Sequence, residues 1–589
     1  MNDSLWIEKA KNWSLNEDFS QDSRLEIETL IQKDEVIELK DRFYKDLEFG
    51  TGGMRGIIGA GTNRINIYTV RRITKAIALS LLDKGNNSPS GLRAVVCYDS
   101  RRYSKEFAAE VCSIFNHYGI KTYLFSRLNP VALLSFAIRE LKAHTGVMIT
   151  ASHNPINYNG YKAYGENGAQ VTPPLDSQIE EKYANISYLD AISTKSNSIN
   201  NPIYLGEDFE KSYLDKIKSC AFNLDLIKKQ GNQLKIVYTP IHGTGLIPVT
   251  AALKDWGFSQ VFVNEIQKNP DSNFPSVKSP NPEDPAALKL VVDQMLHLQA
   301  DVAYGTDPDT DRLGVVINLH QDQQKVLYLN GNEIGALLLY YFLEESQARN
   351  SLTPQTLVVK SIVTSTIQDK MCKHFNIQCL TTLTGFKWMC LEMDRFLQEN
   401  PQGKFLFASE ESFGVLTHPY CRDKDAVAGI AHFSEMLLWL KIVKKMTVVE
   451  YLDSIHQKFG YHKESLISKD YPESDGQIKM QTMMNNLRQE SLSTLNTNLE
   501  KNNIDDSIVK RIDFLTPQKN SSLPPTNCLG FEFASNHYVY LRPSGTEPKI
   551  KLYFLLNFPY ELKKSQSGLE KIQKIEKDLQ NFFQSLIYV

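Results

Sequence analysis

The chain has 589 residues, 42% of them hydrophobic and 23% charged, which is enough length for several domains and an ordinary globular composition. Lys and Arg number 65 against 68 Asp and Glu, a net charge of −3, which excludes the basic field of a typical nucleic-acid-binding protein. No apolar run is long enough to cross a membrane, the first residues do not form a signal peptide, and the eight cysteines contain no Cys-x-x-Cys pair. We therefore expect a cytoplasmic protein that binds neither nucleic acid nor membrane.

A strand–helix–strand pattern occurs three times along the chain. The first copy runs through Arg93–Tyr98, Ser104–Tyr118 and Ile120–Phe125, the second covers residues 234–264 and the third covers residues 356–383. Each helix is followed by Gly119, Gly257 or Asn376, which are the residues that end a helix in a left-handed conformation. Strand–helix–strand units of this length predict parallel pairing through a right-handed crossover. The fold class predicted is α/β, with three similar α/β/α domains.

The last part of the chain predicts a smaller α+β domain. Two strand-like runs, Tyr538–Leu541 and Ile550–Phe554, flank a loop rich in Gly and Pro, and a helical pattern follows them. Polar linkers are expected at Ser193–Pro202 and near residues 320 and 455. The predicted domains are therefore residues 1–205, 206–320, 321–455 and 456–589.

A candidate nucleophile, Ser152, lies in the run Thr150–Pro155 (Thr-Ala-Ser-His-Asn-Pro), directly after an apolar strand-like segment. A turn at the end of a strand presents a hydroxyl at the edge of a sheet. Phosphoryl transfer through a hydroxyl needs nearby cations, for which Lys162 and Arg55 are candidates. His153, next to the serine in the sequence, is a further catalytic candidate. The alternative interpretation of this run is a serine that only caps a helix.

Three acidic residues, Asp307, Asp309 and Asp311, follow the strand-like run Val302–Tyr304. In an extended segment alternate side chains point to one side, so the three carboxylates are expected to converge on one hard cation such as Mg²⁺. A solvated acidic turn is the alternative.

Two further loops have the composition of ligand-binding loops. Glu410 and Ser412 alternate after the apolar run Phe405–Ala408 and are candidates for binding sugar hydroxyls, although a helix cap would use the same residues. The loop that begins at Arg542 offers a guanidinium, two hydroxyls and a glycine, which is the composition of an anion cradle or of a plain hairpin turn; its candidate residues are Arg542, Ser544, Gly545 and Thr546.

Taken together, these motifs resemble the α-D-phosphohexomutase superfamily and, within it, the phosphoglucomutase-2-like branch. The resemblance covers nearly the whole chain. It is carried by the runs Phe49–Gly56, Thr150–Pro155, Asp307–Arg312, Thr384–Lys387, Glu410–Gly414, Arg422–Asp425 and Arg542–Pro548.

The resemblance implies a heart-shaped protein of four domains around a central cleft. It implies that Ser152 is a phosphoserine that also contacts the metal, that Asp307, Asp309 and Asp311 bind Mg²⁺, and that Arg55 and Lys162 flank the reacting phosphoryl group, with Lys162 as acid and base. It further implies a set of substrate-binding residues: Thr384, Gly385, Lys387, Glu410, Ser412, Lys424, Arg542, Ser544, Gly545 and Thr546.

The activity that the resemblance implies is interconversion of glucose 1-phosphate and glucose 6-phosphate through glucose 1,6-bisphosphate, by a monomer or weak dimer. Phosphopentomutase, phosphomannomutase and glucose-1,6-bisphosphate synthase activities belong to the same family and stay open. Outside this class, a phosphatase with Asp307 as nucleophile and an inactive sugar-phosphate-binding protein are the alternatives.

Overall fold

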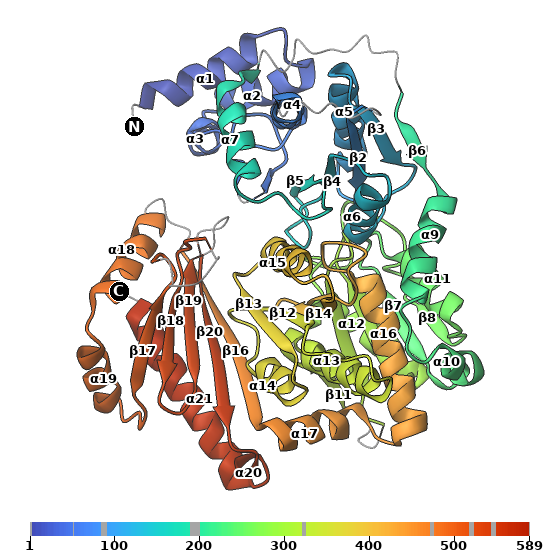
Figure 1. The fold of residues 1–589 in the computed structure, drawn as a ribbon. Coiled ribbons are helices and arrows are strands. Elements are labelled where there is room, and N and C mark those ends of the chain that lie inside the picture. Colours follow the sequence, from blue (N-terminus) through green and yellow to red (C-terminus); the bar gives the residue numbers. More distant parts are fainter. Residues whose placement is uncertain are drawn as a thin grey trace. The chain divides into compact units, whose positions relative to one another are not determined.

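The computed structural model describes residues 3–50, 52–83, 91–188, 201–320, 325–471, 476–516, 524–543 and 549–587. These residues form two compact units. Unit 1 comprises Met1–Gly331, Phe386–Asp394 and Ser412–Trp439, and unit 2 comprises Asn332–Gly385, Arg395–Glu411 and Leu440–Val589. Figure 1 shows the elements of both units.

Unit 1 begins with three helices that the sequence analysis did not predict: α1 (Asp3–Leu15), α2 (Gln21–Gln32) and α3 (Val36–Phe43). An aromatic cluster holds them together, in which the rings of Trp13 and Phe19 stack at 4.0 Å and Phe43 and Tyr68 meet Trp13 edge-on. Aromatic pairs of this kind bury much surface and fix the geometry between helices.

The first sheet of unit 1 is mixed, with the strand order β1-β5-β4-β2-β3-β6. Its strands are β1 (Gly53–Ile57), β2 (Arg93–Tyr98), β3 (Lys121–Phe125), β4 (Thr145–Ile149), β5 (Tyr158–Gly165) and β6 (Ile203–Leu205). Its helices are α4 (Ile67–Asp83), α5 (Ser104–His117), α6 (Val131–Glu140) and α7 (Leu175–Asn185). β2 pairs in parallel with β3 and β4, whereas β5 is antiparallel to β4 and β1. Nearly every residue of β2 and β4 is buried, as expected of strands covered on both faces.

The second sheet of unit 1 has the order β11-β10-β9-β7-β8. Its strands are β7 (Ile236–Thr239), β8 (Val261–Val263), β9 (Val302–Thr306), β10 (Leu313–Asn318) and β11 (Val326–Leu329), and its helices are α9 (Glu207–Lys218), α10 (Leu224–Gln230), α11 (Leu246–Trp256) and α12 (Pro285–Leu298). β7 is parallel to β8 and β9, while β10 is antiparallel to β9. α12 packs its apolar face on β7, β9 and β10.

Unit 2 contains the third strand–helix–strand copy and the C-terminal domain. β12 (Thr356–Ser361) is parallel to both β13 (Gln378–Thr382) and β14 (Lys404–Glu410). The helices of this part are α13 (Gly331–Ala348), α14 (Ile367–His374) and α17 (Val448–Phe459). The boundary that we expected near residue 455 falls inside α17. The expected linkers at Ser193–Pro202 and near residue 320 lie largely outside the described residues.

The C-terminal domain has an antiparallel sheet of order β16-β20-β19-β18-β17. Its strands are β16 (Tyr461–Asp470), β17 (Ile508–Asp513), β18 (Leu529–Phe533), β19 (Tyr538–Pro543) and β20 (Lys549–Phe558), and its helices are α18 (Gly476–Gln489), α19 (Leu492–Lys501), α20 (Tyr560–Lys563) and α21 (Gln566–Ile587). α21 packs along the sheet and fills its core with Leu579, Phe582 and Phe583. The predicted α/β class with a smaller α+β domain is confirmed.

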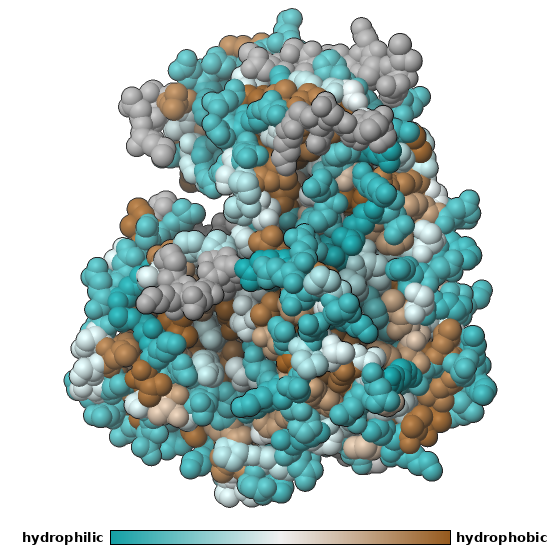
Figure 2. Space-filling model, viewed as in Figure 1, coloured by the Kyte–Doolittle hydropathy of each residue, from teal (hydrophilic) through white to brown (hydrophobic). Residues whose placement is uncertain are grey.

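Three elements remain to be assigned. α15 (Phe386–Glu399) belongs to unit 1 up to Asp394 and to unit 2 from Arg395, whereas β15 (Gly414–Leu416) and α16 (Ala426–Trp439) belong to unit 1. Among the described residues, Ala426–Lys444 is the one helix long and apolar enough to cross a membrane, and 78% of its apolar window is buried inside the protein, as in a core helix. On the face drawn in Figure 2, hydrophilic side chains cover most of the surface and hydrophobic ones are scattered among them.

Candidate functional site

The serine loop leaves the carboxyl end of β4 and turns sharply at Ser152. The backbone of Ser152 has φ 51°, a left-handed conformation that costs a non-glycine residue about 1–2 kcal/mol. The Ser152 N–H donates to Oγ1 of Thr150 at 2.8 Å, and the Thr150 hydroxyl donates to Oδ2 of Asp99 at 2.7 Å. These bonds hold the strained turn, and with it the serine hydroxyl, in one place.

Arg101 clamps this loop, and the sequence analysis missed it. It is 3% exposed, and its Nε lies 3.6 Å from the carboxylate of Asp99. Its guanidinium donates to three carbonyls of the loop, those of Ser152 at 2.6 Å, Pro155 at 2.8 Å and Asn154, and to that of Tyr158 at the start of β5 at 3.0 Å. The sequence offers one signal for this contact: the run Asp99–Arg101 (Asp-Ser-Arg) follows β2, and the serine loop follows β4. Because β2 and β4 are parallel neighbours, their carboxyl ends lie side by side, so residues that follow the two strands can meet.

The three aspartates follow β9 and converge in a buried cluster, where one carboxylate oxygen of each lies within 4.8 Å of the others. The predicted extended backbone is wrong, because residues 308–310 form a turn and bend and Thr310 has φ 54°. Oδ1 of Asp307 accepts hydrogen bonds from the N–H groups of Asp311 at 3.0 Å and Arg312 at 3.1 Å, and these bonds close the turn. The convergence therefore comes from a closed loop and not from strand alternation.

The donor set of this cluster fits a hard divalent cation. Oδ1 of Asp309 and Oδ1 of Asp311 are buried and find no hydrogen-bond partner among the described residues. Burial and the neighbouring carboxylates of Asp311 and Asp309 raise the pKa of Asp307 well above its usual range. The three carboxylates repel one another in a buried site, and a bound Mg²⁺ would neutralise their charge.

Ser152 and this cluster are in direct contact within unit 1, since the Ser152 hydroxyl donates to Oδ2 of Asp307 at 2.7 Å. His153 is the other close neighbour, with Nδ1 3.4 Å from Oγ of Ser152, and its carbonyl accepts from the hydroxyl of Ser279 at 2.8 Å. Candidates more than 150 positions apart in the sequence thus form one site.

Lys162 lies on β5 with its amine against the acidic cluster. Nζ donates to Oδ2 of Asp309 at 2.7 Å and lies 3.5 Å from Oδ2 of Asp311. Burial lowers the pKa of Lys162, but the carboxylates of Asp309 and Asp311 outweigh it and leave that pKa above its usual value. In this arrangement Lys162 is a protonated amine able to give a proton.

Arg55 reaches the serine loop from β1, where it is the register partner of Gly160 on β5. Its Nη1 donates to Oδ1 of Asn154 at 3.2 Å. A Cβ on Gly160 would lie 2.5 Å from the Thr150 carbonyl oxygen, so only glycine lets β1, β5 and the serine loop approach this closely.

Lys424 completes the cationic side of the cluster, with Nζ 3.2 Å from Oδ2 of Asp311 and 3.1 Å from Oδ1 of Asp423. Oδ2 of Asp423 accepts a further hydrogen bond, at 2.7 Å, from the hydroxyl of Tyr164 on β5. A Cβ on Gly414 would lie 2.2 Å from Cδ of Lys424, so the glycine at the start of β15 makes room for the lysine. Tyr164 and Asp423 are further residues that the candidate set lacked.

The structure places the remaining candidates as follows. In unit 2, Glu410 ends β14 and accepts a hydrogen bond from the N–H of Gly385, which has φ 110°, precedes α15 and follows Thr384. Ser412 lies in the turn after Glu411 and belongs to unit 1. Arg542 is the second-to-last residue of β19, whereas Ser544, Gly545 and Thr546 lie outside the described residues. Lys387 lies in the first turn of α15, in unit 1.

Three domain families match this chain in order. They are phosphoglucomutase/phosphomannomutase alpha/beta/alpha domain I over residues 46–190, domain II over residues 211–320 and domain III over residues 330–459. A phosphoglucomutase of Staphylococcus aureus (strain USA300) is 34% identical over 567 residues, which covers 95% of this chain and 96% of the relative.

Solved structures agree at the level of the fold. Parafusin, a phosphoglucomutase from Paramecium in an open form, has a TM-score of 0.66 at 17% identity, covering 92% of this chain and 96% of its own. A phosphoglucomutase/phosphomannomutase family protein from Burkholderia thailandensis has a TM-score of 0.62 at 18% identity, covering 91% and 97%. Similarity along almost the whole length, with all three α/β/α domains matched, shows that this chain belongs to the phosphoglucomutase/phosphomannomutase family of phosphohexomutases.

Proposed function

We propose that the protein is a phosphoglucomutase that interconverts glucose 1-phosphate and glucose 6-phosphate through a phosphoserine at Ser152 and a glucose 1,6-bisphosphate intermediate. The observation that carries this proposal is the 2.7 Å hydrogen bond between the Ser152 hydroxyl and Asp307, inside a buried cluster of three carboxylates and two lysines. A hydroxyl placed beside both a cation site and an acid is what phosphoryl transfer to and from a serine requires.

In the proposed mechanism Asp307, Asp309 and Asp311 would hold Mg²⁺ beside the Ser152 oxygen. When bound, the ion would supply positive charge to the phosphoryl oxygens as their charge rises in the transition state. Arg55 and Lys424 would bind phosphoryl oxygens from the other sides, and Arg101 would keep the serine loop in position.

Proton transfer is assigned to Lys162. Its amine would take the proton of the attacking sugar hydroxyl in one direction and return it to the leaving oxygen in the other. With the charge of Asp309 and Asp311 neutralised by a bound cation, these carboxylates would raise the pKa of the amine less, so the same residue could serve as base.

Substrate binding is assigned to residues that the family resemblance points to. Glu410 and Ser412, with Thr384 and Gly385, would bind sugar hydroxyls. Arg542 with Ser544, Gly545 and Thr546 would bind the phosphate that does not react. Binding energy from that remote phosphate would position the reacting hydroxyl.

The test is a coupled assay with Mg²⁺ and catalytic glucose 1,6-bisphosphate, comparing glucose 1-phosphate, mannose 1-phosphate and ribose 1-phosphate. We expect fastest turnover of glucose 1-phosphate and loss of nearly all turnover in Ser152→Ala, while Ser212→Ala on the exposed face of α9 keeps the wild-type rate. Faster turnover of mannose or ribose phosphate would instead assign a phosphomannomutase or phosphopentomutase. A Ser152→Ala enzyme with near-normal rate would overturn the phosphoserine.

A further inference from the structure

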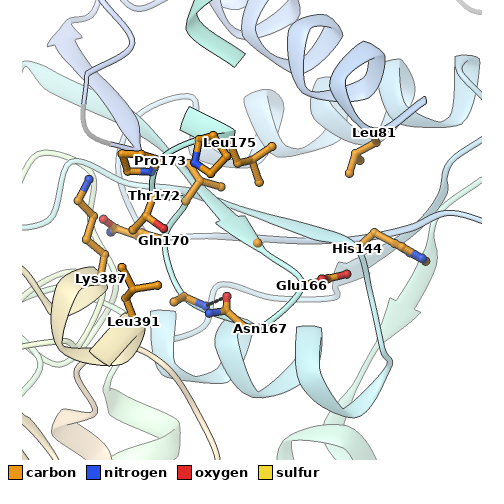
Figure 3. Close-up of a pocket in the computed structure, with 14 residues that line it drawn as sticks. Leu81, His144, Glu166, Asn167, Gln170, Thr172, Pro173, Leu175, Lys387 and Leu391 are labelled. Carbon is orange, nitrogen blue, oxygen red and sulfur yellow. Dashed lines mark hydrogen bonds between the residues drawn. The ribbon is translucent and has the colours of Figure 1, made fainter. Parts of the chain in front are cut away.

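A cavity of about 380 Å³ opens in unit 1. The chain from the end of β5 to the start of α7 supplies most of its lining, and two residues of α15, Lys387 and Leu391, form part of its wall (Figure 3). Neither Ser152 nor any of the three aspartates lines it. A volume of this size is typical of sites for small molecules.

Lys387 gives the cavity a buried cation. The residue is 7% exposed, and its Nζ finds no hydrogen-bond partner among the described residues. Burial lowers the pKa of Lys387 to about 8, although the carboxylate of Asp176 acts in the opposite direction. Burying an ammonium group without hydrogen-bond partners costs free energy, and an anionic group in the cavity would supply the missing partner.

The rest of the lining selects the kind of anion. Neutral hydrogen-bonding side chains are contributed by Asn167, Gln170 and Thr172. Glu166 and His144 also line the cavity, and in Figure 3 both lie on the opposite side from Lys387. One cation can neutralise one negative charge, and a second charge on the ligand would be left unpaired in a space that already contains a carboxylate.

We propose that this cavity is a second ligand site, which binds a small hydroxylated monocarboxylate with its carboxylate on Lys387 and its hydroxyls on Asn167, Gln170 and Thr172. The family resemblance implies that Lys387 contacts the sugar phosphate substrate. The lining of the cavity instead favours a carboxylate as the ligand of this lysine. Binding in this cavity needs neither a phosphorylated serine nor turnover, so it can be tested independently of the mutase activity.

The test is calorimetric titration of the full-length protein with glycerate and with gluconate, in two buffers that differ in ionisation enthalpy. Because the free amine has a pKa of about 8 and pairing with a carboxylate raises it, binding at pH 8 should take up about half a proton per site. The uptake should fall toward zero as the pH is lowered by about two units.

Two variants should weaken binding at least tenfold: Lys387→Met, which removes the cation, and Leu391→Trp, which fills the cavity and keeps the cation. Lys289→Met, an exposed lysine of α12 that pairs with Asp293, is the matched control and should bind as the wild type does. Thermal unfolding of each variant checks that it is folded.

Four results would overturn the proposal. The first is no heat of binding for either acid at millimolar concentration. The second is equal affinity in Lys387→Met and Lys289→Met. The third is a proton uptake that does not change with pH. The fourth is displacement of glycerate by inorganic phosphate at equal concentration, which would make the cavity a phosphate site and not a carboxylate site.

Discussion

Oγ of Ser152 lies 2.7 Å from Oδ2 of Asp307, and this hydrogen bond joins the loop after β4 of the first sheet to the loop after β9 of the second. A second connection runs beside it, since the N–H of Val131 donates to the carbonyl of Asp309 at 3.0 Å. The serine and the carboxylates are therefore held in register by backbone as well as by side chains. Substitutions of individual residues around this contact test what each contributes to metal binding, stability and turnover.

Neutralising one carboxylate should weaken metal binding. In Asp311→Asn the cluster keeps its shape but loses one charged donor, so we expect the Mg²⁺ concentration for half-maximal activity to rise at least tenfold. Metal titration of the rate measures this. Asp301→Asn, an aspartate of the same unit outside the cluster, is the control, and an unchanged Mg²⁺ requirement in Asp311→Asn would remove that residue from the metal site.

Mg²⁺ should also stabilise the fold, because the three buried carboxylates repel one another without it. At a concentration about 100 times the dissociation constant, binding to the native state alone adds about 2.7 kcal/mol to the free energy of unfolding. Denaturant unfolding with Mg²⁺ and with a chelator measures the difference. Asp307→Asn should show a smaller metal effect, and a wild-type protein equally stable in both buffers would contradict the prediction.

Loss of the Arg101 side chain should loosen the serine loop and leave Asp99 buried without its cation. For Arg101→Met we expect destabilisation of about 3–5 kcal/mol and at least a tenfold fall in kcat. The neighbouring Arg102 bonds to Asn273 at the surface, and Arg102→Met is the matched control. Equal rates for the two variants, measured below their unfolding temperatures, would show that the clamp is not needed.

Tyr164→Phe removes the hydroxyl that fixes Asp423, which in turn fixes Lys424. We expect a loss of about 1–2 kcal/mol of stability and a several-fold fall in kcat/KM. Tyr161 is the control on the same strand, because its hydroxyl bonds to Thr74 away from the acidic cluster. If Tyr161→Phe and Tyr164→Phe lowered kcat/KM equally, the effect would not come from Lys424.

Acid should destabilise the protein through buried histidines. Burial lowers the pKa of His432 to about 3 and that of His462 to about 3, whereas an unfolded histidine titrates near 6.5. Their contribution is fully present above about pH 6.5, declines as the pH falls below it and is lost by about pH 3, because only the unfolded chain takes up the protons in that range.

The free energy of unfolding, measured between about pH 7 and pH 4.5, should therefore decrease with falling pH. The slope should be smaller in His432→Gln, whose side chain does not need a proton, and unchanged in His297→Gln, an exposed histidine of α12. Parallel slopes in the wild type and His432→Gln would show that His432 does not contribute.

The sequence by itself determined the local architecture. All three strand–helix–strand copies form with parallel strands, and the residues expected to end their helices do so with left-handed backbones, φ 74° at Gly119, φ 120° at Gly257 and φ 54° at Asn376. The two C-terminal strands pair in antiparallel fashion on either side of their loop. These features follow from hydrophobic periodicity and from the conformations open to single residues, which short stretches of sequence contain.

Only the tertiary structure decided which side chains meet. The carboxylates of Asp307, Asp309 and Asp311 were expected to converge through extended backbone, and they converge through a closed turn. The Asp-Ser-Arg run that contains Arg101 follows β2, but it does not by itself indicate a contact with the serine loop, which exists because β2 and β4 are neighbours in the sheet. The contact of Ser152 with Asp307 joins residues 155 positions apart. Such contacts depend on how whole sheets pack, and that packing is set by many weak interactions that no local stretch of sequence contains.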